Sequence, residues 1–214
     1  MTITIFGANS PAGRFLVTQA LANSMHVTAF DRQIDYFIDL DNRSNMLTAT
    51  KGYVFDEGDV KDALKGADAV VSLLGGGKDG ADRARSLGTH NIIQQMEKAG
   101  MKRLIALAGK PVLDADEEGA KYLMDTTDFP QDEMPLAHEY LSILTQLEAS
   151  ALGWTLVCAP RIADEKGKQQ YITSASHAPI PDKDVIAAGD LADCILKELI
   201  HPRYLHQRVG ISRI

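Results

Sequence analysis

The residues best suited to bind a ligand lie at the start of the chain, where glycines and a serine follow an apolar run. Ile3 to Phe6 is β-branched and apolar and predicts a strand, and a segment of helical periodicity begins at Gly13. The turn between them exposes backbone N–H groups and the positive end of a helix dipole, which together bind phosphate. The spacing differs from the G-x-G-x-x-G fingerprint, and glycine turns of this kind are common in α/β proteins. We expect a dinucleotide pyrophosphate at Gly7, Asn9, Ser10, Pro11, Ala12, Gly13 and Arg14.

The end of the second expected strand, His26 to Phe30, carries two residues with opposite implications for the cofactor. In a dinucleotide-binding fold this position faces the adenosine ribose. A carboxylate such as Asp31 accepts from the 2′-OH and favours NAD. A guanidinium such as Arg32, helped by Arg14, pairs with a 2′-phosphate and favours NADP. Because Asp31 and Arg32 conflict, the residues leave open whether NAD or NADP is preferred. The alternative is that both belong to a charged, solvated turn without a role in binding.

Two further strand ends are candidates for nucleotide contact. A strand at Tyr53 to Phe55 would lead to Asp59 and Val60. The Asp59 carboxylate could accept from the adenine amine, and the Val60 side chain could cover the adenine ring. Alternatively, Asp59 caps a helix from Val60 to Lys65. Ala69 to Leu74 is a continuous apolar run, typical of a strand buried on both faces. The three glycines after it leave room for a ligand or form a flexible loop. The expected contacts here are Asp59, Val60, Leu74, Gly75 and Gly76.

Strand and helix patterns alternate along the chain, which is typical of a doubly wound, mostly parallel sheet. We expect one Rossmann-like α/β domain over residues 1–214, with its first strand inside the sheet and the ligand crevice at the strand ends Phe6, Phe30 and Leu74. A short strand at 36–40 and a polar loop or helix at 42–50 are weaker expectations. The other expected elements are helices at 85–99, 137–151 and 190–200, the last capped by Asp190, and strands at 103–107, 154–159 and 209–212.

The composition argues against several kinds of partner. The chain is 45% hydrophobic and 24% charged, with a net charge of -7 and no cluster of Lys or Arg. Nucleic acid and anionic membranes are therefore poor partners. With no signal-peptide pattern and no apolar run long enough to span a bilayer, we expect a soluble, cytoplasmic protein. Cys158 and Cys194 lie in apolar contexts without metal-ligand spacing, so we expect reduced core cysteines and no metal site.

The segment from Lys110 to Pro135 differs from the rest of the chain in its charge. It follows the expected strand 103–107 and carries eight carboxylates with almost no compensating base. We interpret it as a mobile, acidic loop on the substrate side, at about 110–135, that selects against strongly anionic acceptors. A solvated surface loop is the alternative. The acidic residues are Asp114, Asp116, Glu117, Glu118, Asp125, Asp128, Asp132 and Glu133.

Over nearly its whole length the chain resembles the atypical short-chain dehydrogenase/reductase group with NAD(P)H-binding, NmrA-like domains. The resemblance rests on Gly7 to Arg14, Gly58-Asp59-Val60, GADAVVSLLG at 66–75 and HNIIQQMEKAGMKRLIAL at 90–107. WTLVCAPRIAD at 154–164 and DVIAAGDLADCIL at 184–196 are most similar to its biliverdin-IXβ reductase and flavin reductase branch. The resemblance implies NADPH binding along the glycine turn and direct hydride transfer to flavins, tetrapyrroles or other conjugated acceptors.

Two departures from that group restrict the chemistry that the resemblance implies. Short-chain dehydrogenases acting on alcohols use a Ser and a Tyr-x-x-x-Lys pair, in which the lysine lowers the pKa of the tyrosine. Here Ala108-Gly109 stands where relatives often have serine, and no tyrosine has a lysine four residues later. Alcohol and sugar-nucleotide chemistry is therefore not expected. A flavin reductase depends less on side chains, because positioning the acceptor against the nicotinamide contributes most of the rate.

Three side chains are candidates for catalysis. His138 and Tyr140 begin the helix that would flank the nicotinamide, and either could donate a proton, although a histidine at a helix start is often an ordinary surface residue. Arg161 follows a proline at a strand end, where the related branch has a histidine near the substrate. It could hold an anionic group of the substrate or form an ion pair with Asp164. Ala108 completes the expected cofactor contacts.

Together these features favour an NAD(P)H-dependent reductase that transfers hydride to a small-molecule acceptor such as a flavin, a quinone or a similar conjugated compound. The two arginines and the resemblance slightly favour NADP(H). The alternative is an NAD(P)-binding regulatory or sensor protein without turnover, which the missing Ser and Tyr-x-x-x-Lys fit equally well. The oligomeric state and the physiological substrate are left open.

Overall fold

The computed structural model describes residues 1–41, 45–77 and 79–214 as one Rossmann-like α/β domain. Its central sheet has eight strands in the order β3-β2-β1-β4-β5-β6-β10-β8, and all neighbours are parallel except β10 and β8. β7 and β9 form a separate parallel pair. The strands are β1 (Thr2–Phe6), β2 (His26–Asp31), β3 (Leu47–Lys51), β4 (Ala69–Ser72), β5 (Arg103–Gly109), β6 (Gly153–Ala159), β7 (Arg161–Ala163), β8 (Tyr171–Ala175), β9 (Val185–Ala187) and β10 (Gln207–Arg213).

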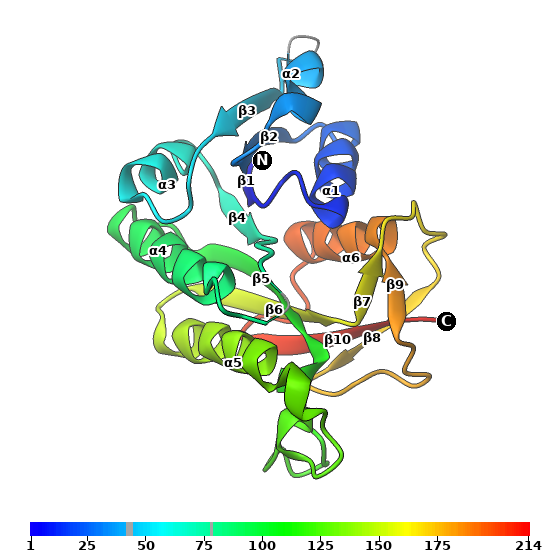
Figure 1. Cartoon of the computed structure of the whole chain (residues 1–214). Coiled ribbons are helices and arrows are strands. Elements are labelled where there is room, and N and C mark those ends of the chain that lie inside the picture. The colour runs from blue at the N-terminus through cyan, green and yellow to red at the C-terminus, as the bar shows by residue number, and fades with distance from the viewer. Residues whose placement is uncertain (42–44, 78) are drawn as a thin grey trace.

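Helices cover both faces of the sheet (Figure 1). α1 and α6 lie on one face, and α3, α4 and α5 lie on the other. Because successive strand residues point to opposite faces, Ile5 belongs to the core under α1 and α6, whereas Phe6 belongs to the core under α3, α4 and α5. The helices are α1 (Pro11–Ala22), α2 (Asp35–Asp41), α3 (Glu57–Ala63), α4 (Ala84–Lys98), α5 (Met134–Ala149) and α6 (Ala188–Ile200).

The prediction of a doubly wound fold is confirmed, and β1 is an internal strand. It pairs with β2 on one side and β4 on the other, so the chain order reverses at β1. Phe6 is in register with Phe30 and with Ser72, which brings the carboxyl ends of these three strands to the same edge. In open α/β sheets, ligands bind at such a switch point.

The strand predicted at 36–40 is wrong, because these residues form part of α2. Phe37 is fully buried and Leu40, one helical turn later, packs against the same core, whereas Tyr36 and Ile38 are about half exposed. This three-residue spacing suits a helix that covers the sheet edge with one side.

The third strand lies earlier than predicted. β3 occupies 47–51 and overlaps the stretch expected to be a polar loop or helix at 42–50, of which residues 42–44 lie outside the described residues. Tyr53–Phe55 is not a strand but a turn, in which the Asp56 amide donates to the Tyr53 carbonyl at 2.9 Å. β3 lies at the edge of the sheet, where polar residues are tolerated. Its strand conformation is set by its pairing with β2, and its side chains give only a weak strand signal.

Two predicted helix caps are also wrong. α3 begins at Glu57 and is capped by Asp56, whose Oδ1 accepts from the Asp59 amide at 2.9 Å. α6 begins at Ala188, so Asp190 already lies in its first turn. Asp190 is buried and accepts from the Gln169 amide at 2.7 Å. Both predictions failed because each helix begins before the expected cap, and each carboxylate binds a backbone amide outside its own helix.

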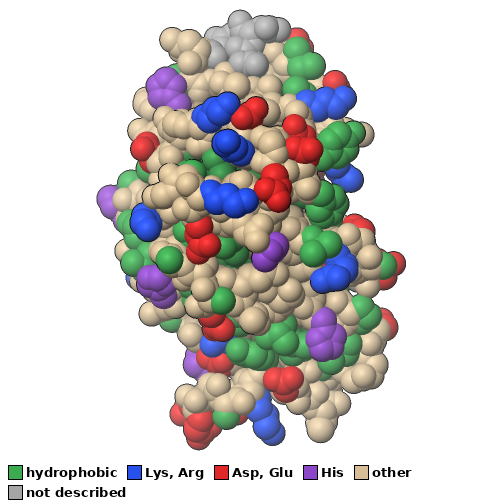
Figure 2. All heavy atoms as spheres, turned by 90° about the vertical axis from the view of Figure 1, so that its left-hand side faces the viewer, with side chains coloured by type: hydrophobic (Ala, Val, Ile, Leu, Met, Phe, Trp, Pro, Cys, Tyr) green, Lys and Arg blue, Asp and Glu red, His purple; other side chains and the backbone are tan. Residues whose placement is uncertain are grey.

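The cysteines and the surface complete the description. Cys158 and Cys194 are buried and unbridged, as predicted, and burial raises the pKa of each thiol to about 12, which makes them unreactive. On the face covered by α3, α4 and α5, basic and acidic side chains are interspersed and form no continuous basic surface (Figure 2). Within the described ranges, none of the helices combines the length and the apolar character needed to cross a membrane.

Candidate functional site

The turn between β1 and α1 packs so closely on neighbouring backbone that two positions exclude a side chain. Gly7 has φ +74°, which glycine adopts without strain, and a Cβ there would lie 2.4 Å from the Leu73 carbonyl oxygen. A Cβ on Gly13 would lie 2.4 Å from the Ala8 carbonyl oxygen. The Oγ of Ser10, which caps α1, accepts from the Gly13 amide at 3.1 Å. The two glycines thus bring the first turn of α1 against the ends of β1 and β4.

The N-terminus of α1 has the features of an anion site. Pro11 has no N–H, and the Gly13 amide is taken by Ser10. In the part of the chain that the structure describes, no acceptor pairs with the Ala12 amide. The first turn of α1 contains no acidic residue. An unpaired amide at the positive end of a helix dipole can bind a phosphate oxygen.

The Asp31 carboxylate, at the end of β2, links two turns of this crevice. Its Oδ2 accepts from the Asn9 amide at 3.1 Å, and its Oδ1 accepts from the Gln33 amide at 3.2 Å. Because both oxygens already hold backbone amides, a ribose hydroxyl would have to share them. The main role of Asp31 is therefore to hold the two turns that shape the crevice.

Arg14 reaches the same end of β2 from α1. Its Nε donates to Asn9 Oδ1 at 3.1 Å, and its guanidinium lies 4.5 Å from the centre of the Tyr36 ring. These contacts orient the guanidinium, and among the described residues its two terminal nitrogens have no hydrogen-bond partner. Arg32, next to Asp31, is exposed. Two guanidinium groups are thus available beside the strand end that was predicted to face the ribose.

Asp82 holds the loop after β4. Its carboxylate accepts from the amides of Gly77 and Ala84 at 2.8 and 3.1 Å. These two hydrogen bonds, and more weakly the charges of Arg85 and Arg32, lower the pKa of Asp82. Asp82 therefore ties the loop after β4 to the start of α4.

Arg85, in the first turn of α4, holds the same loop through two carbonyls. Its guanidinium donates to the Gly76 and Gly77 oxygens at 3.1 and 2.9 Å. Gly75 is exposed, and nothing lies within 4 Å of a Cβ built on it. The loop is therefore held by side chains beside open space, and Leu74 before it is half-buried. No sequence pattern pointed to Asp82 or Arg85; the available signal is an acid and a base soon after three glycines.

Asp59 and Val60 lie near the end of β3 but differ in exposure. Asp59 Oδ2 accepts from the Tyr53 amide at 2.9 Å. A Cβ on Gly52 would lie 2.5 Å from the Phe30 ring and 3.1 Å from that oxygen, so Gly52 allows the carboxylate to approach the ring. Val60 is fully buried in the core with Phe30 and offers no surface to a ligand here.

At the end of β5, Gly109 makes room for an aromatic ring. A Cβ on Gly109 would lie 2.5 Å from Cε2 of Tyr140, so the ring packs directly on the backbone after Ala108, which is buried. Burial raises the pKa of the Tyr140 phenol, and Arg85, 5.8 Å from the ring centre, opposes this effect. Among the described residues the Tyr140 hydroxyl has no hydrogen-bond partner. Tyr140 is therefore a protonated donor beside the end of β5.

The other two predicted catalytic residues are not grouped with Tyr140. His138 is exposed, and residues two apart point to different sides of a helix. Arg161 is exposed at the start of β7, where its amide donates to the Asp184 carbonyl at 3.2 Å. None of the ion pairs found within the described residues joins Arg161 to Asp164.

Lys110, directly after β5, is one of the few bases in the acidic segment. Its Nζ lies 3.0 Å from Asp182 Oδ2 and 3.8 Å from Asp184 Oδ1. Gly109 and Ala159 are partners in the sheet, so Lys110 and Arg161 follow neighbouring strand ends. The charge of Lys110 is largely neutralised by its partners, whereas that of Arg161 is not.

The acidic segment leaves β5 as expected, but its first half is anchored. Asp114 is buried and accepts from the Arg208 guanidinium at 2.8 and 3.2 Å. The Asp116 carbonyl accepts from His177 Nε2 at 3.0 Å, and Met124 is buried. These contacts tie the segment to the end of the sheet formed by β8 and β10. They argue against a freely mobile loop, and Arg208 supplies a base that the local sequence lacks.

The fold and this edge of the sheet define a class: Rossmann-like domains whose glycine turn and helix N-terminus lie at a topological switch point. Residues 7–202 match the sequence profile of a family described as NAD(P)H-binding. The chain belongs to this NAD(P)H-binding family.

Several known proteins are similar to the chain over its full length. The uncharacterized protein YwnB of Bacillus subtilis (strain 168) is 26% identical over 216 residues, covering 99% of this chain and 98% of YwnB. The structure of a protein from Streptococcus pneumoniae TIGR4, described as "a putative NADH-flavin reductase", has a TM-score of 0.83 at 25% identity and covers 100% of both chains. A wide-type short-chain dehydrogenase/reductase from Veillonella parvula DSM 2008, solved with NADP, has a TM-score of 0.78 at 15% identity, over 99% of this chain and 94% of that one. This last likeness concerns the fold alone.

Proposed function

We propose that the protein is an NADPH-dependent reductase that delivers hydride to a flavin, a quinone or a similar conjugated acceptor. The observation that carries the proposal is the arrangement at one edge of the sheet. An anion site at the start of α1 lies at one end of the crevice, and the protonated Tyr140 phenol lies beside β5. Membership of the NAD(P)H-binding family and the likeness to the pneumococcal protein support it.

The residues at this edge fit a dinucleotide, because the Ala12 amide is unpaired and Gly75 faces open space. When bound, NADPH supplies the hydride. Asp59 would lie toward the adenine, Arg14, Asp31 and Arg32 toward the ribose, and Leu74, Gly75, Gly76 and Ala108 toward the nicotinamide. The pyrophosphate would lie at Gly7, Asn9, Ser10, Pro11, Ala12 and Gly13.

The preference for NADPH rests on how Asp31 and the two arginines are used. Both Asp31 oxygens hold backbone amides, which weakens it as a ribose ligand. The Arg14 guanidinium is oriented by Asn9 and Tyr36 and still has free donors. Guanidinium groups pair with phosphate through charge-assisted hydrogen bonds. The 2′-phosphate is therefore the group that this corner of the crevice fits.

On the acceptor side, Tyr140 would donate a proton and Arg161 would attract an anionic group. A phenol is protonated at neutral pH, and burial of Tyr140 raises its pKa further. A positioned acid assists reduction of acceptors that gain a proton with the hydride. Lys110 contributes little attraction because Asp182 already pairs with it. We therefore expect neutral acceptors, or acceptors with one negative group, to be preferred.

The proposed activity is tested by mixing the protein with NADPH and a panel of acceptors. The panel comprises FMN, riboflavin, a soluble quinone and a tetrapyrrole, and the loss of nicotinamide absorbance is followed. Oxidation of NADPH that requires both the protein and one of these acceptors supports the proposal. Tight binding of NADPH with no oxidation by any acceptor contradicts it and favours the NAD(P)-binding regulator, which the absent Ser and Tyr-x-x-x-Lys also fit.

The position of the nucleotide is tested separately by Gly75→Ala. A Cβ at this position meets nothing within 4 Å, so the variant should unfold at the same urea concentration as the parent protein. If a ligand packs against Gly75, its affinity should fall by about tenfold, as expected for an overlap of one methyl group. Gly13→Asp adds a negative charge at the start of α1 and a Cβ that the turn excludes, and both effects should abolish NADPH binding. Unchanged NADPH affinity in both variants would reject the crevice as the site.

A further inference from the structure

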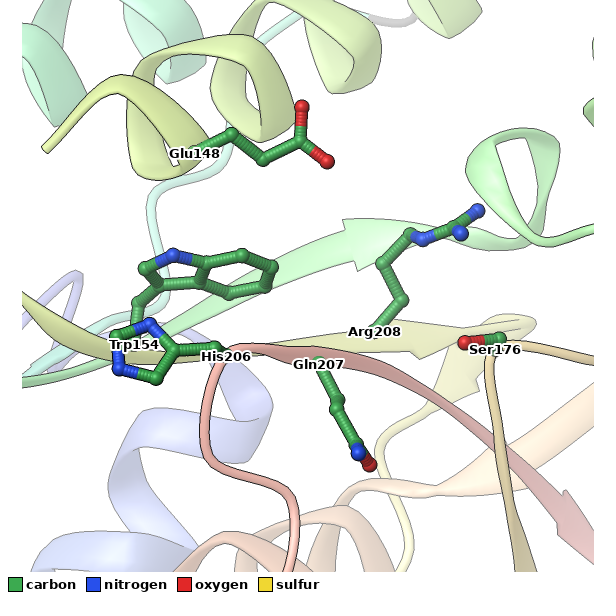
Figure 3. Close-up of a pocket in the computed structure, with 6 residues that line it drawn as sticks. All are labelled: Glu148, Trp154, Ser176, His206, Gln207 and Arg208. Carbon is green, nitrogen blue, oxygen red and sulfur yellow. The ribbon is translucent and has the colours of Figure 1, made fainter.

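A second cavity lies away from the nucleotide crevice (Figure 3). It has a volume of about 320 Å³, at the lower end of the range for small-molecule sites. It lies beside the last turn of α5 and the first residues of β6 and β10, whereas the crevice lies at the carboxyl ends of the strands. Its lining residues are Glu148, Trp154, Ser176, His206, Gln207 and Arg208.

Trp154 gives the cavity an aromatic wall with a fixed orientation. Trp154 is 6% exposed, and the His206 ring meets its indole nearly edge-on, with centroids 6.0 Å apart. Figure 3 shows the Trp154 and Arg208 side chains on either side of a space that Glu148 approaches from α5. An indole beside an open space can receive an apolar group or a cation.

The charges around this space favour a cation. The charge of Arg208 is already paired, because its guanidinium donates to Asp114 at 2.8 Å and to the Val112 carbonyl at 2.7 Å. It points away from Trp154 (Figure 3). The Glu148 carboxylate is exposed, and no ion pair or hydrogen bond of its side chain is found within the described residues. Among the residues that line the cavity, Glu148 therefore supplies a carboxylate without an ionic partner.

The end of α5 adds to this negative potential. The last carbonyls of a helix carry a partial negative charge, which basic side chains usually offset. The last turn of α5 has no basic residue and instead carries Glu148. This placement is unfavourable for the helix by itself and becomes favourable when a cation binds nearby.

We propose that this cavity binds an organic cation: a protonated amine or guanidinium joined to an apolar body. The cationic group would lie between the Glu148 carboxylate and the end of α5, and the apolar part would lie against Trp154. This site is separate from the nucleotide crevice and does not depend on the proposed reductase activity.

Trp154 is the single tryptophan of the chain, so its fluorescence reports directly on the cavity. The protein is titrated, without nucleotide, with phenethylammonium and with phenylpropionate, an anion of similar shape. Phenethylammonium should change the emission saturably at submillimolar to millimolar concentration, and phenylpropionate should not. Glu148→Gln should weaken phenethylammonium binding by about fivefold, whereas Glu118→Gln, which neutralises an exposed glutamate of the acidic segment, should leave it unchanged.

Three outcomes would overturn the proposal. They are an emission that does not change with phenethylammonium, equal binding of the cation and the anion, and equal affinity in the Glu148→Gln variant and the parent protein. Glu148 is exposed and unpaired, so its replacement should not disturb folding, which an unchanged urea unfolding curve would verify.

Discussion

Replacing Arg14 and Arg32 by alanine should separate NADPH binding from NADH binding. Charge-assisted hydrogen bonds contribute about 1.5–3 kcal/mol each. Arg14 is half-buried and held by Asn9 and Tyr36, so we place it near 1.5 kcal/mol, which corresponds to about a tenfold loss of NADPH affinity. Arg32 is exposed and screened by solvent, so about 1 kcal/mol, or about fivefold, is expected. NADH lacks the 2′-phosphate, and its affinity should stay within about twofold of the parent value.

Dissociation constants for both nucleotides are measured by calorimetry on the two single variants and the double variant. If the arginines act independently, the double variant should lose about fiftyfold for NADPH. Arg213→Ala removes an exposed arginine from the far end of β10 and serves as the control. Equal loss of NADPH and NADH affinity would mean that the arginines only support the local structure. If neither nucleotide loses affinity, the adenosine ribose does not bind beside these arginines.

Three further substitutions test the acceptor side and the anchored acidic segment. Tyr140→Phe should lower kcat for quinone reduction by about a hundredfold without changing the Kd for NADPH. An unchanged kcat would show that the phenol takes no part in catalysis. Asp114→Asn leaves the half-buried Arg208 guanidinium without its ionic partner, so urea unfolding should show a loss of about 3 kcal/mol; exposed Asp128, changed to Asn, should show none. Asp182→Asn leaves Lys110 with only the more distant Asp184 as an ionic partner, so the KM for FMN should fall about threefold relative to riboflavin at low salt. The absence of such a change, or its persistence in high salt, would contradict an electrostatic cause.

The type and order of most elements follow from local patterns in the chain. The apolar run at 69–74 and the βαβ alternation were sufficient to predict an internal first strand and a doubly wound sheet, because strand burial and helix periodicity are properties of short segments. The glycine turn was recognisable for the same reason. Gly7 and Gly13 meet the backbone of residues near them in sequence or in a neighbouring strand, and any close turn of this kind requires glycine.

Elements whose residues are neither clearly apolar nor periodic were predicted poorly. β3 is an edge strand with a polar composition, and the short strands β7, β8 and β9 lie in a stretch for which no strand was predicted. Their conformation is set by pairing with other strands: β8, for example, pairs with β10, which lies 30 or more residues further along the chain. Intrinsic strand preference is weak compared with such pairing.

The roles of individual polar side chains depended on contacts between distant parts of the chain. Gly109 receives the ring of Tyr140, and Arg208 compensates Asp114 from 94 positions away. Local sequence could nominate Tyr140 as a proton donor and mark the segment after β5 as acidic. Only the packing of α5 on β5 places the phenol at a strand end, and only the position of Arg208 in β10 anchors that segment. Hydrogen bonds and ion pairs act over a few ångströms, and tertiary packing decides which side chains come that close.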